Sequence, residues 1–93
     1  MSAVRIAIVG DRDAGFRPHV ATDEALDHAA TALGIAIDSH WVPTSSVLEG
    51  AGVESFRACD GLWIAPGSPY ASLEGALGAI RFAREHGWPL VAT

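Results

Sequence analysis

The sequence is short of basic residues, of cysteine and of long apolar runs, and each shortage narrows the functions open to it. Its 6 Lys and Arg residues, set against 11 Asp and Glu, leave a net charge of −5 and form no basic stripe, so we expect no nucleic-acid partner. No apolar run approaches the ~20 residues that cross a bilayer, so we expect no membrane partner either. A single cysteine permits no internal disulfide, which fits the reducing cytoplasm that we expect as its location.

Motifs that hold nucleotides or metal ions are also missing. Neither G-x-G-x-x-G nor G-x-x-x-x-G-K-[S/T] occurs, so no dinucleotide site or phosphate-binding loop is predicted. The 4 histidines, at positions 19, 28, 40 and 86, fall on different expected elements without the spacing of metal ligands. We therefore predict neither a metal site nor a cofactor.

Apolar residues, by contrast, are abundant. They make up 49% of the 93 residues, and the mean hydropathy is +0.25. A domain this small buries only ~60–65% of the surface that its unfolded chain exposes, so much of its surface should be polar. One explanation is an ordinary compact core. The other, which we favour, is that part of the apolar surface meets another chain or further residues.

Four short apolar runs, with helical patterns between them, predict an α/β fold with a parallel sheet. The expected strands are residues 4–9, 35–42, 62–65 and 89–92. Residues 35–42 alternate between apolar and polar side chains, as an edge strand with one solvated face does. The prediction is therefore an open, mostly parallel sheet in a flavodoxin-like three-layer sandwich, with strand order 2-1-3-4.

Capping residues predict where the helices begin and end. Thr22 is expected to cap the first helix after an irregular stretch over 12–20, and Gly34 is expected to end that helix. Ser72 is expected to cap the last helix and Gly87 to end it. The remaining expected segments are a loop over 43–52 and a short helix over 53–59.

The last apolar run, residues 89–92, is unusual for the edge position that the strand order gives it. It lacks the polar alternation that protects a sheet edge from further pairing. We therefore expect residues 1–93 to form one partial domain that is unfinished at Thr93. Otherwise the last strand is expected to pair with a second copy, as a homodimer, or with a complementing chain.

The stretch over 60–70 combines a strand with an abrupt stop. Residues 60–61 (Asp-Gly) form a turn dipeptide, and residues 62–65 follow as a buried strand. Residues 66–69 (Pro-Gly-Ser-Pro) forbid further pairing, because proline has no backbone N–H. A helix begins near Ser72, so free backbone N–H groups are expected beside the carboxyl end of the strand, where open α/β sheets bind ligands.

Several motifs occur in an order that resembles class I glutamine amidotransferases. The likeness is to the small stand-alone proteins that are similar to the glutaminase domain of CTP synthase. It spans nearly all of this chain but only the first part of such a domain. The matching segments are residues 4–11 (VRIAIVGD), 19–26 (H-x-A-T-x-x-A-L), 60–63 (DGLW), 66–76 (P-G-S-P-Y-x-x-x-E-G-A), 79–85 (A-I-R-x-A-R-E) and 87–90 (G-x-P-L).

The resemblance implies hydrolysis of the glutamine amide by a cysteine nucleophile. In the family this cysteine lies on a sharp turn directly after the strand that matches residues 89–93, and a His–Glu pair follows much farther along. All three residues then lie outside this chain, which we expect to be inactive alone. Some members carry selenocysteine at the nucleophile position, and its codon also reads as stop. A fragment, a reading frame terminated there and a whole protein stay open as alternatives.

Candidate site residues follow from the resemblance and from the expected strand ends. Gly67 and Ser68 correspond to the oxyanion loop, whose backbone N–H groups stabilise the negative charge that develops on the amide oxygen. Ser68 stands where typical members have a second glycine, and their loop is longer, which leaves the identity of the donor open. The candidate substrate-side residues around this loop are Pro66, Tyr70, His19 and Asp11.

Cys59 precedes the buried strand at the end away from this crevice, so we expect a structural thiol and not a nucleophile. The alternative to a partial amidotransferase domain is a complete, non-catalytic, flavodoxin-like module for binding or dimerisation. In such a module the last strand pairs across a homodimer.

Overall fold

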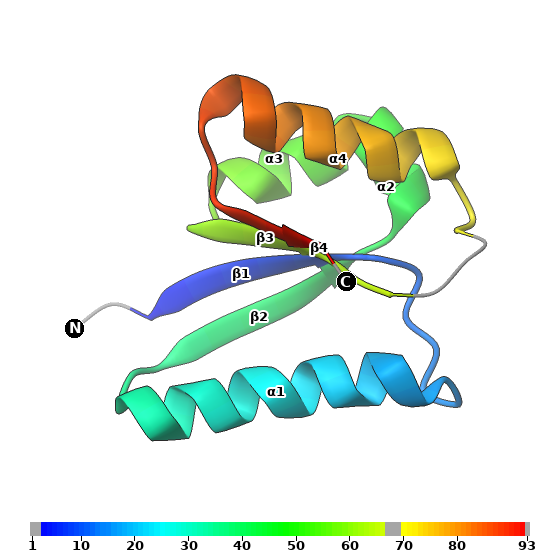
Figure 1. The fold of residues 1–93 in the computed structure, drawn as a ribbon. Coiled ribbons are helices and arrows are strands. Elements are labelled where there is room, and N and C mark those ends of the chain that lie inside the picture. Colours follow the sequence, from blue (N-terminus) through cyan, green and yellow to red (C-terminus); the bar gives the residue numbers. More distant parts are fainter. Residues whose placement is uncertain (1–2, 67–69, 93) are drawn as a thin grey trace.

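A computed structural model describes residues 3–66 and 70–92 and is drawn in Figure 1. Its elements are β1 (Val4–Val9), α1 (Arg17–Leu33), β2 (Ile37–Val42), α2 (Thr44–Leu48), α3 (Ala51–Arg57), β3 (Gly61–Ile64), α4 (Leu73–His86) and β4 (Leu90–Ala92). The strands pair in parallel in the order β2-β1-β3-β4. Helix α1 covers one face of the sheet, and α2, α3 and α4 cover the other (Figure 1). The predicted three-layer α/β fold and its strand order are confirmed.

The hydrophobic core lies between the sheet and the layer formed by α2, α3 and α4. Its buried members are Ala7, Val9, Val42, Val47, Phe56, Cys59, Leu62, Ile64, Ala79 and Phe82. The rings of Phe56 and Phe82 pack with their centroids 5.4 Å apart. Full burial of one such side chain contributes roughly 1.5–3 kcal/mol. This core holds the three helices firmly against the strands, so the loops at the strand ends start from fixed positions.

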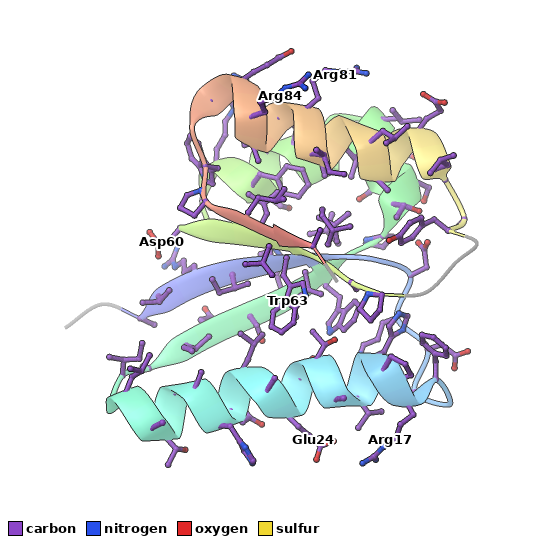
Figure 2. All side chains as sticks on the ribbon, viewed as in Figure 1. Arg17, Glu24, Asp60, Trp63, Arg81 and Arg84 are labelled. Atoms are coloured by element: carbon purple, nitrogen blue, oxygen red, sulfur yellow. The ribbon has the colours of Figure 1, made fainter. Side chains whose placement is uncertain are left out.

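The opposite face of the sheet is covered by α1 alone. One row of paired residues crosses all four strands on this face: Trp41, Ile8, Trp63 and Val91. Figure 2 shows Trp63 pointing from β3 toward α1, while Arg17 and Glu24 point from α1 away from the sheet. Ile8 is fully buried, whereas Val91 on the edge strand is 56% exposed. The cover that α1 provides therefore thins toward β4.

Helix α1 begins earlier than the sequence predicted. It starts at Arg17, with Pro18 in its first turn, and Thr22 lies buried inside it. The Thr22 hydroxyl donates to the carbonyl of Pro18 at 2.9 Å, so it bonds back along the helix and does not cap it. The predicted cap at Thr22 is therefore wrong. The predicted irregular stretch over 12–20 is confirmed for residues 12–16 and wrong for residues 17–20, which belong to α1. Proline is well tolerated in a first turn, because the missing N–H would have no partner there.

The predicted loop over 43–52 contains a short helix, α2, which follows Pro43 and starts at Thr44. A helix of five residues is too short to leave a readable apolar period in the sequence. The short helix expected over 53–59 is present as α3 but starts at Ala51. The loop prediction is wrong for the α2 residues.

The other capping predictions are confirmed. The Ser72 hydroxyl accepts the backbone N–H of Gly75 at 3.0 Å and caps α4. Gly34 and Gly87 end α1 and α4 with φ of 66° and 74°, a left-handed conformation that favours glycine. None of the helices within residues 3–66 and 70–92 has the length and apolarity that crossing a bilayer requires.

The contact between α2 and α4 depends on Gly75. A Cβ atom at this position would overlap the carbonyl group of Thr44, so the two helices can approach this closely only when residue 75 is glycine. We expect Gly75→Ala to lower the free energy of unfolding by about 1–3 kcal/mol or more, because backbone must move to relieve the overlap. Urea unfolding followed by circular dichroism measures this change.

Gly78→Ala, one turn later in α4, is the matched control. Its methyl group would meet only Cγ1 of Val47, at 3.4 Å, which is ordinary contact. Alanine is favoured over glycine inside helices by roughly 0.5–1 kcal/mol, so this variant should be as stable as the parent or more stable. Equal stability of the two variants would contradict the close helix approach.

Candidate functional site

The candidate site lies at the carboxyl edge of the sheet, where the chain leaves β3 and returns as α4. Gly67 and Ser68, the predicted oxyanion residues, lie outside the described residues, so their role stays a prediction. The residues on either side of them are described: Ala65 and Pro66 before, and Tyr70 to Ser72 after. Hydrogen bonds from the ends of β1 and β2 and from the first turn of α1 hold both of these flanks.

The first flank is held by His19, which is only 5% exposed. Its Nδ1 accepts the backbone N–H of Asp13 at 3.0 Å, and its Nε2 lies 2.8 Å from the carbonyl oxygen of Pro66. Because Nδ1 accepts a hydrogen bond, it carries no hydrogen, so Nε2 must carry the ring proton and donate a hydrogen bond to the carbonyl of Pro66. The rings of Phe16 and Trp41 pack against the imidazole, with centroids 4.8 and 4.9 Å away. His19 thus anchors Pro66 to the start of α1.

The second flank is held by three hydrogen bonds. The Tyr70 hydroxyl donates to the carbonyl of Ala65 at 2.9 Å, which ties the two flanks to each other. The backbone N–H of Ala71 donates to Oδ2 of Asp11 at 2.9 Å. The backbone N–H of Ser72 donates to the Thr44 hydroxyl, also at 2.9 Å. The chain therefore enters α4 with its direction fixed by the loops that follow β1 and β2.

Asp11 is the acceptor on which these bonds converge. Besides Ala71, its carboxylate accepts the backbone N–H of Thr44 at 3.0 Å and the Thr44 hydroxyl at 2.8 Å. Burial would raise the pKa of Asp11, but the hydrogen bonds from Ala71 and Thr44, together with the nearby His19, outweigh burial and lower the pKa below its ordinary value. Both oxygens are engaged, so the geometry suits a residue that positions the backbone.

Thr44 is the residue of this site that the sequence did not reveal. It is fully buried, and it contacts Asp11 and Ser72, which lie 33 and 28 positions away in the sequence. The sequence feature that could have pointed to Thr44 is its position after a strand that neighbours β1 in the predicted strand order.

The four predicted substrate-side residues thus gather at this edge. Asp11, His19, Pro66 and Tyr70 lie on the described flanks of the segment or hold them directly. Each makes a hydrogen bond within the protein that fixes the backbone. Whether any of them also contacts a substrate stays a prediction.

Cys59 lies at the opposite end of β3, as predicted. Its Sγ donates to the carbonyl of Ser55 at 3.3 Å, and it is buried. Burial raises the pKa of the thiol, and the neighbouring Asp60 raises it further. At about 3.3 Å per residue, the strand separates Cys59 from Pro66 by roughly 20 Å. A protonated thiol at that distance does not serve the candidate site.

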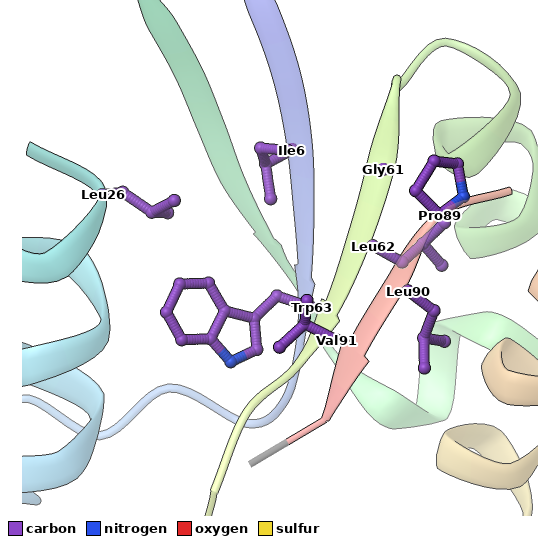
Figure 3. Close-up of a pocket in the computed structure, with 8 residues that line it drawn as sticks. All are labelled: Ile6, Leu26, Gly61, Leu62, Trp63, Pro89, Leu90 and Val91. Atoms are coloured by element: carbon purple, nitrogen blue, oxygen red, sulfur yellow. The ribbon is translucent and has the colours of Figure 1, made fainter. Parts of the chain in front are cut away.

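Two hollows border Trp63 on the α1 face. The smaller, of ≈ 260 Å³, lies beside Pro66 between α1 and the end of β3. The larger, of ≈ 380 Å³, lies over β3 and β4, and Figure 3 shows Leu26 of α1 and Ile6, Trp63 and Val91 of the strands around it. Among the residues that the structure describes, no charged side chain lines either hollow. Within residues 3–66 and 70–92, moreover, no three His, Cys, Asp or Glu residues gather as metal ligands would.

Comparison with known proteins connects this architecture to one enzyme. No protein-family model matches the chain. The CTP synthase of Symbiobacterium thermophilum is 34% identical over 90 residues, which are 92% of this chain and 17% of that protein. The CTP synthase of Desulfovibrio desulfuricans is 34% identical over 86 residues, again 92% of this chain and 16% of that protein. The solved Trypanosoma brucei CTPS glutaminase domain with bound acivicin matches with a TM-score of 0.78 and 28% identity, covering 97% of this chain and 36% of that one.

The chain is similar to the glutaminase domain of CTP synthase. The resemblance that the motifs indicated is thereby confirmed in both sequence and fold. The chain spans about one sixth of the CTP synthases that it matches and about a third of the glutaminase domain structure. The likeness to the glutaminase domain structure extends over 97% of this chain.

The hydrogen bonds of the Asp11 carboxylate should make the free energy of unfolding depend on pH in the acid range. Because the pKa of Asp11 is lowered in the folded state, Asp11 contributes fully to the free energy of unfolding above the ordinary aspartate pKa of ~3.9. This contribution is lost as the pH falls through the lower pKa of the folded state. We expect Asp11→Asn to lower the free energy of unfolding by about 1–2 kcal/mol at neutral pH, since hydrogen bonds to a charged acceptor are lost. The difference between the variant and the parent should shrink below about pH 4.

Asp27→Asn is the control for this change. Asp27 is exposed on α1, so its replacement should alter stability by no more than about 0.5 kcal/mol. Guanidinium unfolding at a series of pH values measures both variants. If the Asp11→Asn protein is as stable as the parent at every pH, the hydrogen bonds of the Asp11 carboxylate do not stabilise the fold.

Proposed function

We propose that this chain forms the first part of a glutamine amidotransferase domain, a hydrolase similar to the CTP synthase glutaminase. In this proposal the sheet carries the glutamine site at its carboxyl edge, and the segment from Pro66 to Ser72 supplies the side of the site that faces the amide oxygen. The observation that carries the proposal is the match to the glutaminase structure over 97% of the chain, at a TM-score of 0.78.

The chemistry requires a fixed backbone at this edge. A cysteine thiolate attacks the amide carbon of glutamine, and the carbonyl oxygen becomes an oxyanion. The amide nitrogen takes a proton from the histidine of the His–Glu pair, the C–N bond breaks as the oxyanion collapses, and ammonia leaves behind a thioester. Water then hydrolyses the thioester to glutamate and returns the thiol. Backbone N–H groups aimed in advance at the oxyanion lower the barrier, and removing one such donor in a hydrolase costs ~10²–10³ in rate. We propose Gly67 and Ser68 as these donors, since Pro69 has no N–H.

The hydrogen bonds around the segment support this role. His19 holds Pro66, Tyr70 bonds to Ala65, and Asp11 holds Ala71. Anchors on both sides of a short segment restrict its conformations, so less entropy is lost when it stabilises the transition state. We propose that Asp11 and His19 serve the site by positioning it, and that Pro66 and Tyr70 border the substrate.

The nucleophile must come from elsewhere. Cys59 is buried at the far end of β3 and has a raised pKa, so it is unsuited to attack. We propose that the reactive cysteine or selenocysteine and the His–Glu pair lie beyond Thr93, and that residues 1–93 alone are inactive. The alternative of a non-catalytic binding or dimerisation module has no support in the comparisons.

We further propose a cytoplasmic location and a partner at β4. Among the described residues β4 pairs with β3 alone, and Val91 is 56% exposed. A further strand, from a complementing chain or a second copy of this chain, would continue the sheet there.

Glutamine hydrolysis provides the test. Residues 1–93 alone should release no ammonia from glutamine above the uncatalysed rate. The DNA that follows the codon for Thr93 should encode an in-frame Cys or UGA and an amidotransferase-like extension, and the extended polypeptide should release ammonia from glutamine. In that polypeptide Cys59→Ser should retain activity, because Cys59 is not the nucleophile. Ammonia release by residues 1–93 that depends on Cys59 would contradict the proposal.

A further inference from the structure

Thr44 forms hydrogen bonds beside the proposed site, although it takes no part in the proposed reaction. It lies at the start of α2, directly after β2, and its side chain is fully buried. A buried hydroxyl must have hydrogen-bond partners, and Thr44 finds them on two other segments of the chain. One is Asp11 after β1, at 2.8 Å, and the other is Ser72 before α4, at 2.9 Å.

The directions of these bonds are determined by the groups involved. The Asp11 carboxylate can only accept, so the Thr44 hydroxyl donates its proton to it. The backbone N–H of Ser72 can only donate, so the same hydroxyl oxygen accepts from Ser72. The hydroxyl therefore links a negative charge at the end of β1 to the entry of α4. The backbone N–H of Thr44 also donates to Asp11 at 3.0 Å, which orients the threonine itself.

We infer that Thr44 is a positioning residue of the proposed amidotransferase site, acting through its hydroxyl to couple the Asp11 carboxylate to the chain at Ala71 and Ser72. The inference rests on the proposed function, because the position of this chain segment matters to chemistry only if the segment borders a site. Thr44 does not touch the reacting atoms. It sets the direction in which the chain passes from the predicted oxyanion residues into α4.

Two substitutions separate the hydroxyl from the rest of the side chain. Thr44→Val keeps the shape and the methyl group and places a second methyl where the hydroxyl was, so it removes the donor to Asp11 and the acceptor for Ser72. Thr44→Ser keeps the hydroxyl and removes only a methyl group. If positioning depends on the hydroxyl, the Thr44→Ser variant should keep the chain at Ala71 and Ser72 in place and the Thr44→Val variant should not, although valine preserves the packing better.

Amide hydrogen exchange in the chain of 93 residues measures the effect. The amide of Ser72 should exchange about tenfold faster or more in Thr44→Val than in the parent, since it loses the hydroxyl that accepts its hydrogen bond. The amide of Ala71 keeps its acceptor, Asp11, but should also exchange faster, because Asp11 loses the hydroxyl that helps to orient it. In Thr44→Ser both amides should stay near the parent rates. The amides of Gly10 and Ala65, which donate to Val42 and Val9 at 3.0 Å, are internal controls for the sheet and should not change.

The outcomes separate this inference from the proposed function. Unchanged exchange at Ala71 and Ser72 in Thr44→Val would overturn the inference and leave the glutaminase proposal untouched. Equal acceleration at Gly10 and Ala65 would also overturn it, because Thr44 would then serve the whole fold. In an active extended polypeptide, Thr44→Val should lower kcat roughly tenfold or more with little change in KM, and Thr44→Ser should retain kcat. A KM effect alone would contradict a positioning role.

Discussion

The Asp11 carboxylate is the interaction on which the carboxyl edge of the sheet depends. It joins three chain segments that leave neighbouring strands: its own after β1, Thr44 after β2, and Ala71 on the way to α4. Loops at strand ends have few apolar contacts to fix them, so hydrogen bonds to a charged group are the strongest restraint available there. The lowered pKa of Asp11 is the thermodynamic sign of this restraint, because the same bonds favour the charged carboxylate.

The two faces of the sheet are packed unequally. Toward α2, α3 and α4 the core is closed and includes fully buried Phe56. Toward α1 a hollow of ≈ 380 Å³ remains over β3 and β4, beside Trp63 and Leu26 (Figure 3). The apolar side chains around this hollow, among them the 56% exposed Val91, add to the high apolar content of the chain. The unequal packing also agrees with the similarity to a glutaminase domain of which this chain covers 36%.

The sequence predicted what depends on local patterns. The strand order followed from the alternation in β2, and the limits of α4 followed from a capping serine and a glycine that takes positive φ, Ser72 and Gly87. The start of α1 was missed because Thr22 and Pro18 are both common near helix starts, and packing decided between them. Thr44 was missed because its partners lie 33 and 28 residues away, and no local pattern encodes such bonds. His19 was found as a candidate, but its bond to Pro66 emerged only from the fold.

The most direct test of whether the candidate site is anchored from both sides is which nitrogen of the His19 ring carries the proton. Because Nδ1 accepts the Asp13 N–H at 3.0 Å, the bond of 2.8 Å to the Pro66 carbonyl requires the proton on Nε2. A long-range ¹H–¹⁵N correlation spectrum at slightly alkaline pH should show a single tautomer of His19 protonated at Nε2, beside averaged signals from the exposed His28. A proton on Nδ1, or averaging of His19 like that of His28, would contradict the anchored edge.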